Sequence, residues 1–304
     1  MTALLQIAFD ALSLGSLYAI CALGIALIFG VMRLVNFAQG DYIAFCVFAL
    51  LWPSIDATAI VFLGNLPWFV LVPVVLMFGA GISVASEILV FRRFRNANPA
   101  TMMIASFAVG FVIQHVLLLL FSSRPKSINL WPALGLPVEI LGARIPLLQL
   151  ITIIITVAIL IALTAFLRRT RYGLEMRAAA ENFTMARMLG VRANRVIMLA
   201  FAVSGALAAA VGLIRVTQTG TADIQMGVSV MLVAFIATVI GGLGSLTGAV
   251  LAGYLIGAAS VVMQVGLPLE ARPFRDAFVY GAVIVSLIWR PQGLFAPNST
   301  KQRI

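Results

Sequence analysis

Long uncharged apolar runs, separated by short polar segments, constrain the fold of this chain more than any other feature. A membrane-spanning helix needs about 20 consecutive apolar residues, and runs of this kind recur from residue 7 to residue 289. With 62% hydrophobic and 10% charged residues, the chain has too little polar surface to cover a soluble globule of 304 residues. We therefore predict an all-α polytopic membrane protein. The expected spans, eight or nine with the region 228–265 least defined, are 7–31, 42–63, 68–90, 101–121, 146–167, 196–214, 228–241, 248–265 and 277–289.

The distribution of basic residues predicts how these spans are oriented. Loops on the cytoplasmic side of a membrane protein carry an excess of Lys and Arg. Fourteen of the twenty basic residues fall on one side of the predicted spans, namely Arg33, Arg92, Arg93, Arg95, the seven arginines of residues 168–195, Arg290, Lys301 and Arg303. The other six are Arg124, Lys126, Arg144, Arg215, Arg272 and Arg275. The larger group is expected to be cytoplasmic, which places the N-terminus outside.

A charged, amphipathic segment at residues 170–196 interrupts the apolar sequence. A helical pattern places Met176, Ala180, Phe183 and Leu189 near one stripe, and Gly190 offers a stop. We interpret the segment as a docking helix between two spans, where the membrane protein meets a partner in water.

Two further interruptions set glycines and small polar residues between apolar half-segments. The first is residues 36–41 (NFAQGD) and the second is residues 241–248 (GGLGSLTG). Unpaired backbone groups at membrane depth are tolerated only where protein or a water-filled path covers them, and broken helices often line transport paths. An ordinary interfacial turn explains each equally well. The candidate path residues are Asn36, Gln39, Gly40, Asp41, Gly241, Gly242, Gly244, Ser245 and Thr247.

Gln114 and His115 lie in the middle of the fourth apolar run. Facing lipid without partners costs such side chains on the order of 1–3 kcal/mol, so we expect them to face the bundle interior. There they would either line or gate a path, or form an interhelical hydrogen bond, which we favour.

Motifs for covalent chemistry are absent from the sequence. It contains no phosphate loop, HExxH, paired CxxC or GxSxG pattern, so we expect no catalytic residue, no metal site and no nucleotide hydrolysis on this chain. Cys21 and Cys46 are predicted to be core thiols.

The net charge of +10 comes from short loops rather than a basic patch with aromatics, which favours lipid contact over nucleic acid. Nearly all carboxylates fall at or beyond span ends, so ion coupling lacks its usual relay groups.

Several motifs, in the same order along the chain, resemble the smaller permease subunit of branched-chain amino acid ABC importers. They are GSLYAICALGIALIFGVMRLVNFAQGDYIA (15–44), EILVFR (87–92), RYGLEMRAAAENFTMARMLGV (171–191), AFIATVIGGLGSLTGAVLAG (234–253) and WRPQGLF (289–295). The resemblance covers the chain nearly end to end. It implies one transmembrane permease domain over residues 1–304, with a cytoplasmic coupling loop at about 168–195.

The resemblance also implies a coupling role and a set of partners. The positions that match the ATPase-coupling helix are Arg177, Ala179, Ala180, Glu181, Ala186, Leu189 and Gly190. Expected partners are two ATPase subunits that use ATP and Mg, a related second permease, an external substrate-binding protein and membrane lipid. The expected location is the bacterial inner membrane. The implied substrates are leucine, isoleucine and valine, and the resemblance leaves other amino acids, amides and urea open.

Two classes of alternative remain at this point. An ion-coupled secondary transporter would work without partner subunits. The other class is an intramembrane enzyme, for which the sequence supplies no set of facing catalytic groups, or an assembly scaffold, which would tolerate changes at both glycine-rich interruptions.

Overall fold

The structure is a computed structural model. It describes residues 2–54, 56, 60–63, 66–95, 97–128, 130–135, 137–140, 143–290 and 293–294. Predictions made for Lys301 and Arg303, and for Pro291, Gln292 and Phe295 of the last motif, lie outside these residues.

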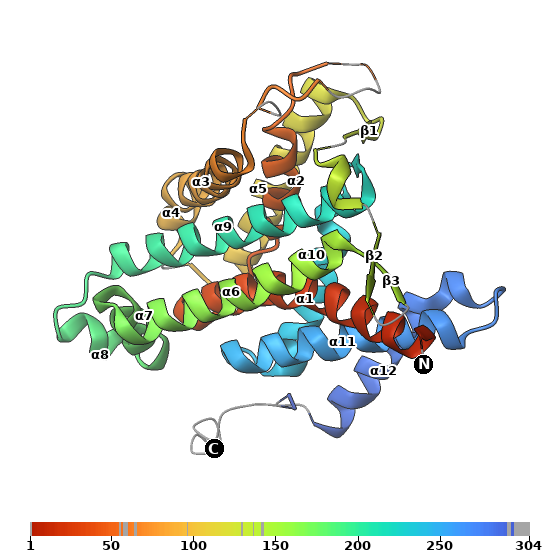
Figure 1. Cartoon of the computed structure of the whole chain (residues 1–304). Helices are drawn as coiled ribbons and strands as arrows, with labels where there is room; N and C mark the ends of the chain where they lie inside the picture. The colour runs from red at the N-terminus through yellow and green to blue at the C-terminus, as the bar shows by residue number, and fades with distance from the viewer. Residues whose placement is uncertain are drawn as a thin grey trace. The chain divides into compact units, whose positions relative to one another are not determined.

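Helices dominate the described chain (Figure 1). They are α1 (Thr2–Met32), α2 (Gln39–Phe48), α3 (Trp68–Ser86), the π-helical turn η1 (Glu87–Phe91), α4 (Arg92–Phe94), α5 (Pro99–Phe121), α6 (Leu147–Arg169), α7 (Arg171–Glu181), α8 (Phe183–Met188), α9 (Ala193–Thr219), α10 (Met226–Gly241), α11 (Leu246–Gly266) and α12 (Arg275–Trp289). Short 3₁₀ turns occupy η2 (Pro132–Gly135) and η3 (Arg272–Phe274). Two small antiparallel pairs join β1 (Lys126–Ser127) to β4 (Thr221–Ala222) and β2 (Pro137–Ile140) to β3 (Ala143–Pro146).

The predicted all-α membrane class is confirmed, but the count of eight or nine spans is not. Six helices of the described chain are long and apolar enough to cross a membrane, and α10 is a shorter apolar helix. The six stretches are Leu4–Met32, Trp68–Phe94, Pro99–Phe121, Leu147–Arg169, Ala193–Thr219 and Leu246–Gly266.

The predicted span at 42–63 is wrong. Helix α2 ends at Phe48, and Leu51 pairs with Val61 in an isolated antiparallel bridge. Pro53 explains the early end, because a proline removes a helical donor and disfavours helical backbone at the residue before it. The amide of Trp52 instead donates to the Ile60 carbonyl at 2.9 Å.

The chain packs into two compact units. The first comprises Met1–Ala26, Trp131–Ile161 and Val233–Ile304, and the second comprises Leu27–Leu130 and Ala162–Leu232. In the first unit α11 lies directly against α1: a Cβ on Gly253 would come within 2.7 Å of the Ala19 Cα, and Gly257 meets the Gly15 backbone equally closely. Small residues let helices in a membrane approach closely and gain van der Waals contact. Cys21 is buried in this unit, as predicted for a core thiol.

Helix α9 is the centre of the second unit. It packs beside α3 and α2, and both helices lie next to it in Figure 1. Gly205 of α9 faces Gly79 of α3, where a Cβ on Gly79 would come within 2.7 Å of the Ala209 Cβ. Gly212 meets α2 in the same way, because a Cβ on it would come within 2.9 Å of the Ile43 carbonyl oxygen. Cys46 of α2 is buried here and carries a free thiol, as predicted.

Candidate functional site

The first interruption is a buried, non-helical break between α1 and α2. Helix α1 ends at Met32 and α2 begins at Gln39, and Asn36 and Gln39 are almost fully buried. Backbone donors freed by the break find side-chain partners. The Ala38 amide donates to the Asn36 Oδ1 at 3.1 Å, and the Phe37 amide donates to the Ser106 Oγ of α5 at 3.2 Å. The break is therefore a defined conformation held by neighbouring protein, as non-helical backbone at membrane depth requires.

A pair of hydrogen bonds joins the start of α2 to α9. The Gln39 Nε2 donates to the Ser204 carbonyl at 3.0 Å, and the Ser204 Oγ donates to the Gln39 Oε1 at 3.0 Å. Both side chains are fully buried. Leaving either group unpaired would cost about 1–3 kcal/mol, so this contact fixes the orientation of α2.

Helix α2 also approaches two other helices closely at glycines. Gly40 meets Gly227 of α10, where a Cβ on Gly40 would come within 3.0 Å of the Gly227 carbonyl oxygen. The Asp41 carboxylate lies against Gly110 of α5, and a Cβ there would overlap it. Among the predicted path residues, the structure therefore gathers Asn36, Gln39, Gly40 and Asp41 into one buried cluster.

Three buried polar atoms in and beside this cluster, the Asn36 Nδ2, the Tyr42 hydroxyl and the Ser83 Oγ, make no hydrogen bond of good geometry within the described residues. The Tyr42 hydroxyl does lie within reach of the Asn36 and Ser86 side chains. Because buried polar groups are normally satisfied, such atoms in a native protein call for a functional explanation. Tyr42 and Ser83 were not among the predicted path residues, and periodicity alone does not separate them from ordinary core positions.

The second interruption has a different character. It is a tight turn from α10 to α11 in which Gly242 and Gly244 have φ angles of 94° and 90°, a left-handed region that favours glycine. The Gly248 amide donates to the Ser245 Oγ at 3.1 Å, which caps α11. Gly244 and Thr247 are exposed, whereas Gly241 and Gly242 are buried. This geometry matches the alternative of an ordinary turn.

The charged segment forms two short helices rather than one. Asn182 has extended backbone angles (φ −148°, ψ 100°), ends α7, and caps α8 by accepting from the Met185 amide at 3.1 Å. This break interrupts the predicted stripe, so Leu189 does not share the buried face of Met176 and is 85% exposed. Gly190, with φ of 88°, follows the end of α8 as predicted.

The seven predicted coupling residues divide between the two faces of this segment. Ala179 and Ala186 are buried and Ala180 is half-buried. Arg177, Glu181, Leu189 and Gly190 are exposed. With Met185 and Met188, Leu189 makes an exposed apolar surface on and just after α8.

Arg33 connects the charged segment to the buried break. Its guanidinium Nη2 donates to the Ala180 carbonyl at 2.9 Å, one residue before α7 ends. A positive side chain at this end of a helix also complements the helix dipole. Arg33 adopts φ of 57°, a left-handed conformation that is costly for a non-glycine residue. From the sequence, Arg33 was only expected to lie on the cytoplasmic side. Its φ angle and its contact with Ala180 are seen only in the structure.

A basic cavity of about 700 Å³ lies beside this link, with Arg33, Arg92, Arg95 and Arg187 among its lining residues. Behind two of these arginines, Glu87 is fully buried and forms ion pairs with Arg92 at 2.9 Å and with Arg95. Glu87 is one of the carboxylates expected at or beyond span ends, but it occupies the π-helical turn inside the long helix of Trp68–Phe94. The sequence did contain a signal for this ion pair, because the EILVFR motif (87–92) includes both Glu87 and Arg92.

His115 is exposed on α5 rather than inside the helix packing as predicted, and Gln114 is half-buried. The His115 Nδ1 lies 2.9 Å from the Phe111 carbonyl of the same helix, and its ring packs on Phe111 with centroids 3.8 Å apart. This contact lies within α5 rather than between helices, and a path role for Gln114 and His115 stays a prediction.

Six apolar helices of the described chain that are long enough to cross a membrane, with a buried polar break between α1 and α2, are the features of a polytopic membrane protein. The family model described as "Branched-chain amino acid transport system / permease component" matches residues 7–287, so the chain belongs to this permease family.

The chain is similar to two curated relatives over nearly its whole length. The high-affinity branched-chain amino acid transport system permease protein BraD of Pseudomonas aeruginosa is 30% identical and covers 95% of each chain. The corresponding LivH of Escherichia coli is 30% identical over 95% of this chain and 94% of the relative. These relatives are transport proteins, not enzymes, and no comparison supports the ion-coupled alternative.

A solved structure shares the fold. A chain of PsaBC from Streptococcus pneumoniae, in complex with Fab, aligns with a TM-score of 0.50 and 14% identity, and the alignment covers 98% of this chain and 96% of that chain.

Proposed function

We propose that this chain forms one half of the membrane path of an ATP-driven importer for branched-chain amino acids, and that the α1–α2 break lies on that path. The buried polar cluster in an otherwise apolar bundle carries the proposal. A branched-chain amino acid has a zwitterionic head and an apolar tail, which suit a few small polar groups within apolar walls. The buried polar groups of Asn36, Tyr42 and Ser83 are of this kind. A lining role for residues 241–248 stays a prediction.

The surface on α8 is the proposed ATPase contact. Exposed Met185, Met188 and Leu189 give it apolar area of the kind that marks protein interfaces. The adjoining basic cavity supplies positive charge for acidic groups of the partner. On this proposal the ATPase subunits bind and hydrolyse ATP with Mg, while this chain receives their movement.

Arg33 is the proposed connection between ATPase and path. A displacement of α7 moves the Ala180 carbonyl, which pulls on Arg33 at the end of α1. The break follows Arg33 directly and is held to α9 through Gln39 and to α5 through Phe37. Movement of α7 can thereby shift the population between two arrangements of the break, as alternating access requires.

We also propose that the chain sits in the bacterial inner membrane with its N-terminus outside. Two groupings in the second unit support this orientation. Arg33, Arg92, Arg95 and Arg187, all predicted to be cytoplasmic, line one cavity. Lys126, predicted to be outside, is buried in β1, which pairs with β4 at the far end of α9. An external binding protein and a related second permease would complete the importer.

The mass and composition of the complex test this proposal. The full chain is tagged, extracted gently from native membranes and weighed by native mass spectrometry. We expect two ATPase subunits and a second permease, with recovery of the ATPases falling for Leu189→Asp and unchanged for Leu269→Asp, a matched exposed leucine outside the charged segment. Recovery of this chain alone from native membranes, or equal recovery of ATPases with both variants, would contradict it.

A further inference from the structure

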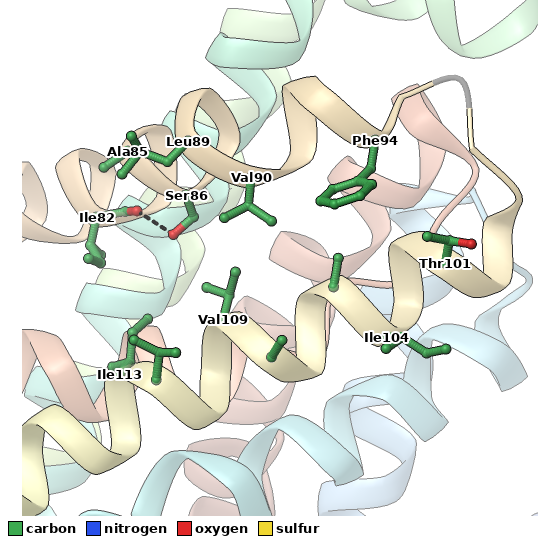
Figure 2. A pocket seen from close by; sticks show the side chains of 13 residues that line it. Ile82, Ala85, Ser86, Leu89, Val90, Phe94, Thr101, Ile104, Val109 and Ile113 are labelled. Atoms are coloured by element: carbon green, nitrogen blue, oxygen red, sulfur yellow. Dashed lines mark hydrogen bonds between the residues drawn. The ribbon is translucent and has the colours of Figure 1, made fainter.

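A long apolar groove runs along the second unit between the α3–η1–α4 helix and α5. Figure 2 shows Val90 and Phe94 on one wall and Val109 on the other, turned toward each other across it. The groove encloses about 460 Å³, within the usual range of ligand pockets. The Ser86 hydroxyl at its wall donates to the Ile82 carbonyl at 2.8 Å, so that polar group is already satisfied within its own helix.

The groove ends at a positively charged helix terminus. Phe94 and Thr101 lie at the same end (Figure 2), and residues 92–95 of this end contribute three arginines against the single carboxylate of Glu87. Arg92 and Arg95 are both engaged by Glu87. Arg93, directly before Phe94, is exposed and has no hydrogen-bond or ion-pair partner within the described part of the chain. One cation therefore remains available beside the mouth of an apolar groove.

This combination fits a lipid better than a protein helix. An acyl chain is narrow and flexible enough to lie in a groove of about 460 Å³ lined almost entirely by apolar side chains, and the Arg93 cation beside the groove matches an anionic headgroup rather than an apolar helix. The charged end is on the side predicted to be cytoplasmic, where anionic lipids give the membrane surface a negative potential. The neighbouring π-helical turn η1 forms part of the wall, and such turns frequently occur at functional sites.

We propose that this groove is a binding site for an anionic phospholipid, with an acyl chain between α3 and α5 and the phosphate at Arg93. The groove borders the proposed translocation path at Ser86, whose side chain lies near the Tyr42 hydroxyl, and its other lining residues are distinct from the path residues and from the α8 surface. Arg93 selects the headgroup by charge, and the groove selects for a chain by burying apolar surface.

The test uses the full complex in nanodiscs with two photoactivatable lipids, one phosphatidylglycerol and one phosphatidylcholine, each labelled on the acyl chain. Labelled peptides are mapped by mass spectrometry. Arg93→Gln removes the cation, and Ala108→Phe fills the groove. Arg124→Gln and Val157→Phe are matched controls at exposed positions outside the groove.

We expect phosphatidylglycerol to label residues 82–113 in preference to phosphatidylcholine. Arg93→Gln should lower phosphatidylglycerol labelling about fivefold, the factor for one basic residue at an anionic surface, and leave phosphatidylcholine labelling unchanged. Ala108→Phe should lower both, and if that variant is not recovered, Arg93→Gln decides. Equal labelling by the two lipids, or no effect of Arg93→Gln, would overturn the proposal. A photoreactive residue at position 109 that captures the second permease instead of lipid would also overturn it and identify a subunit interface.

Discussion

Replacing Arg33 with glycine should separate stability from coupling. Arg33 holds a left-handed φ of 57° and donates to the Ala180 carbonyl at 2.9 Å. Glycine adopts that φ without the steric penalty, which is roughly 1–2 kcal/mol for other residues. It also removes the hydrogen bond, which we put at about 1 kcal/mol because the side chain is exposed. The two effects nearly cancel in the free energy of unfolding.

For transport, no second effect of Arg33→Gly offsets the loss of the hydrogen bond to Ala180. If Arg33 carries the link, losing about 1 kcal/mol of coupling free energy lowers leucine uptake per ATP hydrolysed about fivefold. Arg33→Lys should give an intermediate value, because lysine keeps the charge but lacks the planar guanidinium fork.

The assay is ATP-driven uptake of radiolabelled leucine into proteoliposomes that hold the whole complex, with phosphate release measured in parallel. Thermal unfolding of the same preparations reports stability. Arg124→Gly, an exposed arginine outside the link, is the control. A wild-type ratio of leucine to ATP for Arg33→Gly, at unchanged stability, would refute the assigned role of Arg33.

Three further substitutions test other parts of the account. Gly205→Val should destabilise the fold by about 1–3 kcal/mol through overpacking against α3, read as a lower melting temperature; Gly81→Val, where a Cβ meets nothing within 4 Å, is its control. Gln39→Leu should cost about 1–3 kcal/mol because it removes both buried hydrogen bonds between Gln39 and Ser204, and it should slow uptake, which Gln39→Glu would partly restore if bonding to Ser204 is what matters. Leu189→Asp should change stability by less than about 0.5 kcal/mol, because the side chain is 85% exposed, yet abolish ATPase stimulation by this complex.

Each of these outcomes has a clear contrary. Equal melting temperatures for the Gly205 and Gly81 variants would mean that α3 and α9 do not pack as described. Normal uptake by Gln39→Leu would remove the break from the path. Full ATPase stimulation with Leu189→Asp would place the ATPase contact elsewhere.

The sequence was sufficient for the membrane class because apolar length is a property of the chain alone. It also located the α1–α2 break, since Asn36, Gln39 and Asp41 are polar residues in an apolar setting. The prediction failed at residues 42–63 because it followed hydropathy alone and gave too little weight to the local effect of Pro53. It also missed the exposed position of His115, whose ring contacts Phe111 of the same helix.

The contacts that make the site depend on long-range packing. Gln39 and Ser204 are 165 residues apart, and Arg33 and Ala180 are 147 apart, so no local pattern predicts either pair. The resemblance to importer permeases marked residues 171–191 as a coupling segment. It did not reveal that Asn182 divides that segment into two helices.

The most direct test of the central claim measures leucine uptake and ATP hydrolysis together in vesicles that contain this chain with its co-purified partners. The account predicts uptake that requires ATP, stops when the ATPase subunits are removed, and is insensitive to collapse of ion gradients. Uptake by this chain alone, driven by an ion gradient and indifferent to ATP, would contradict it.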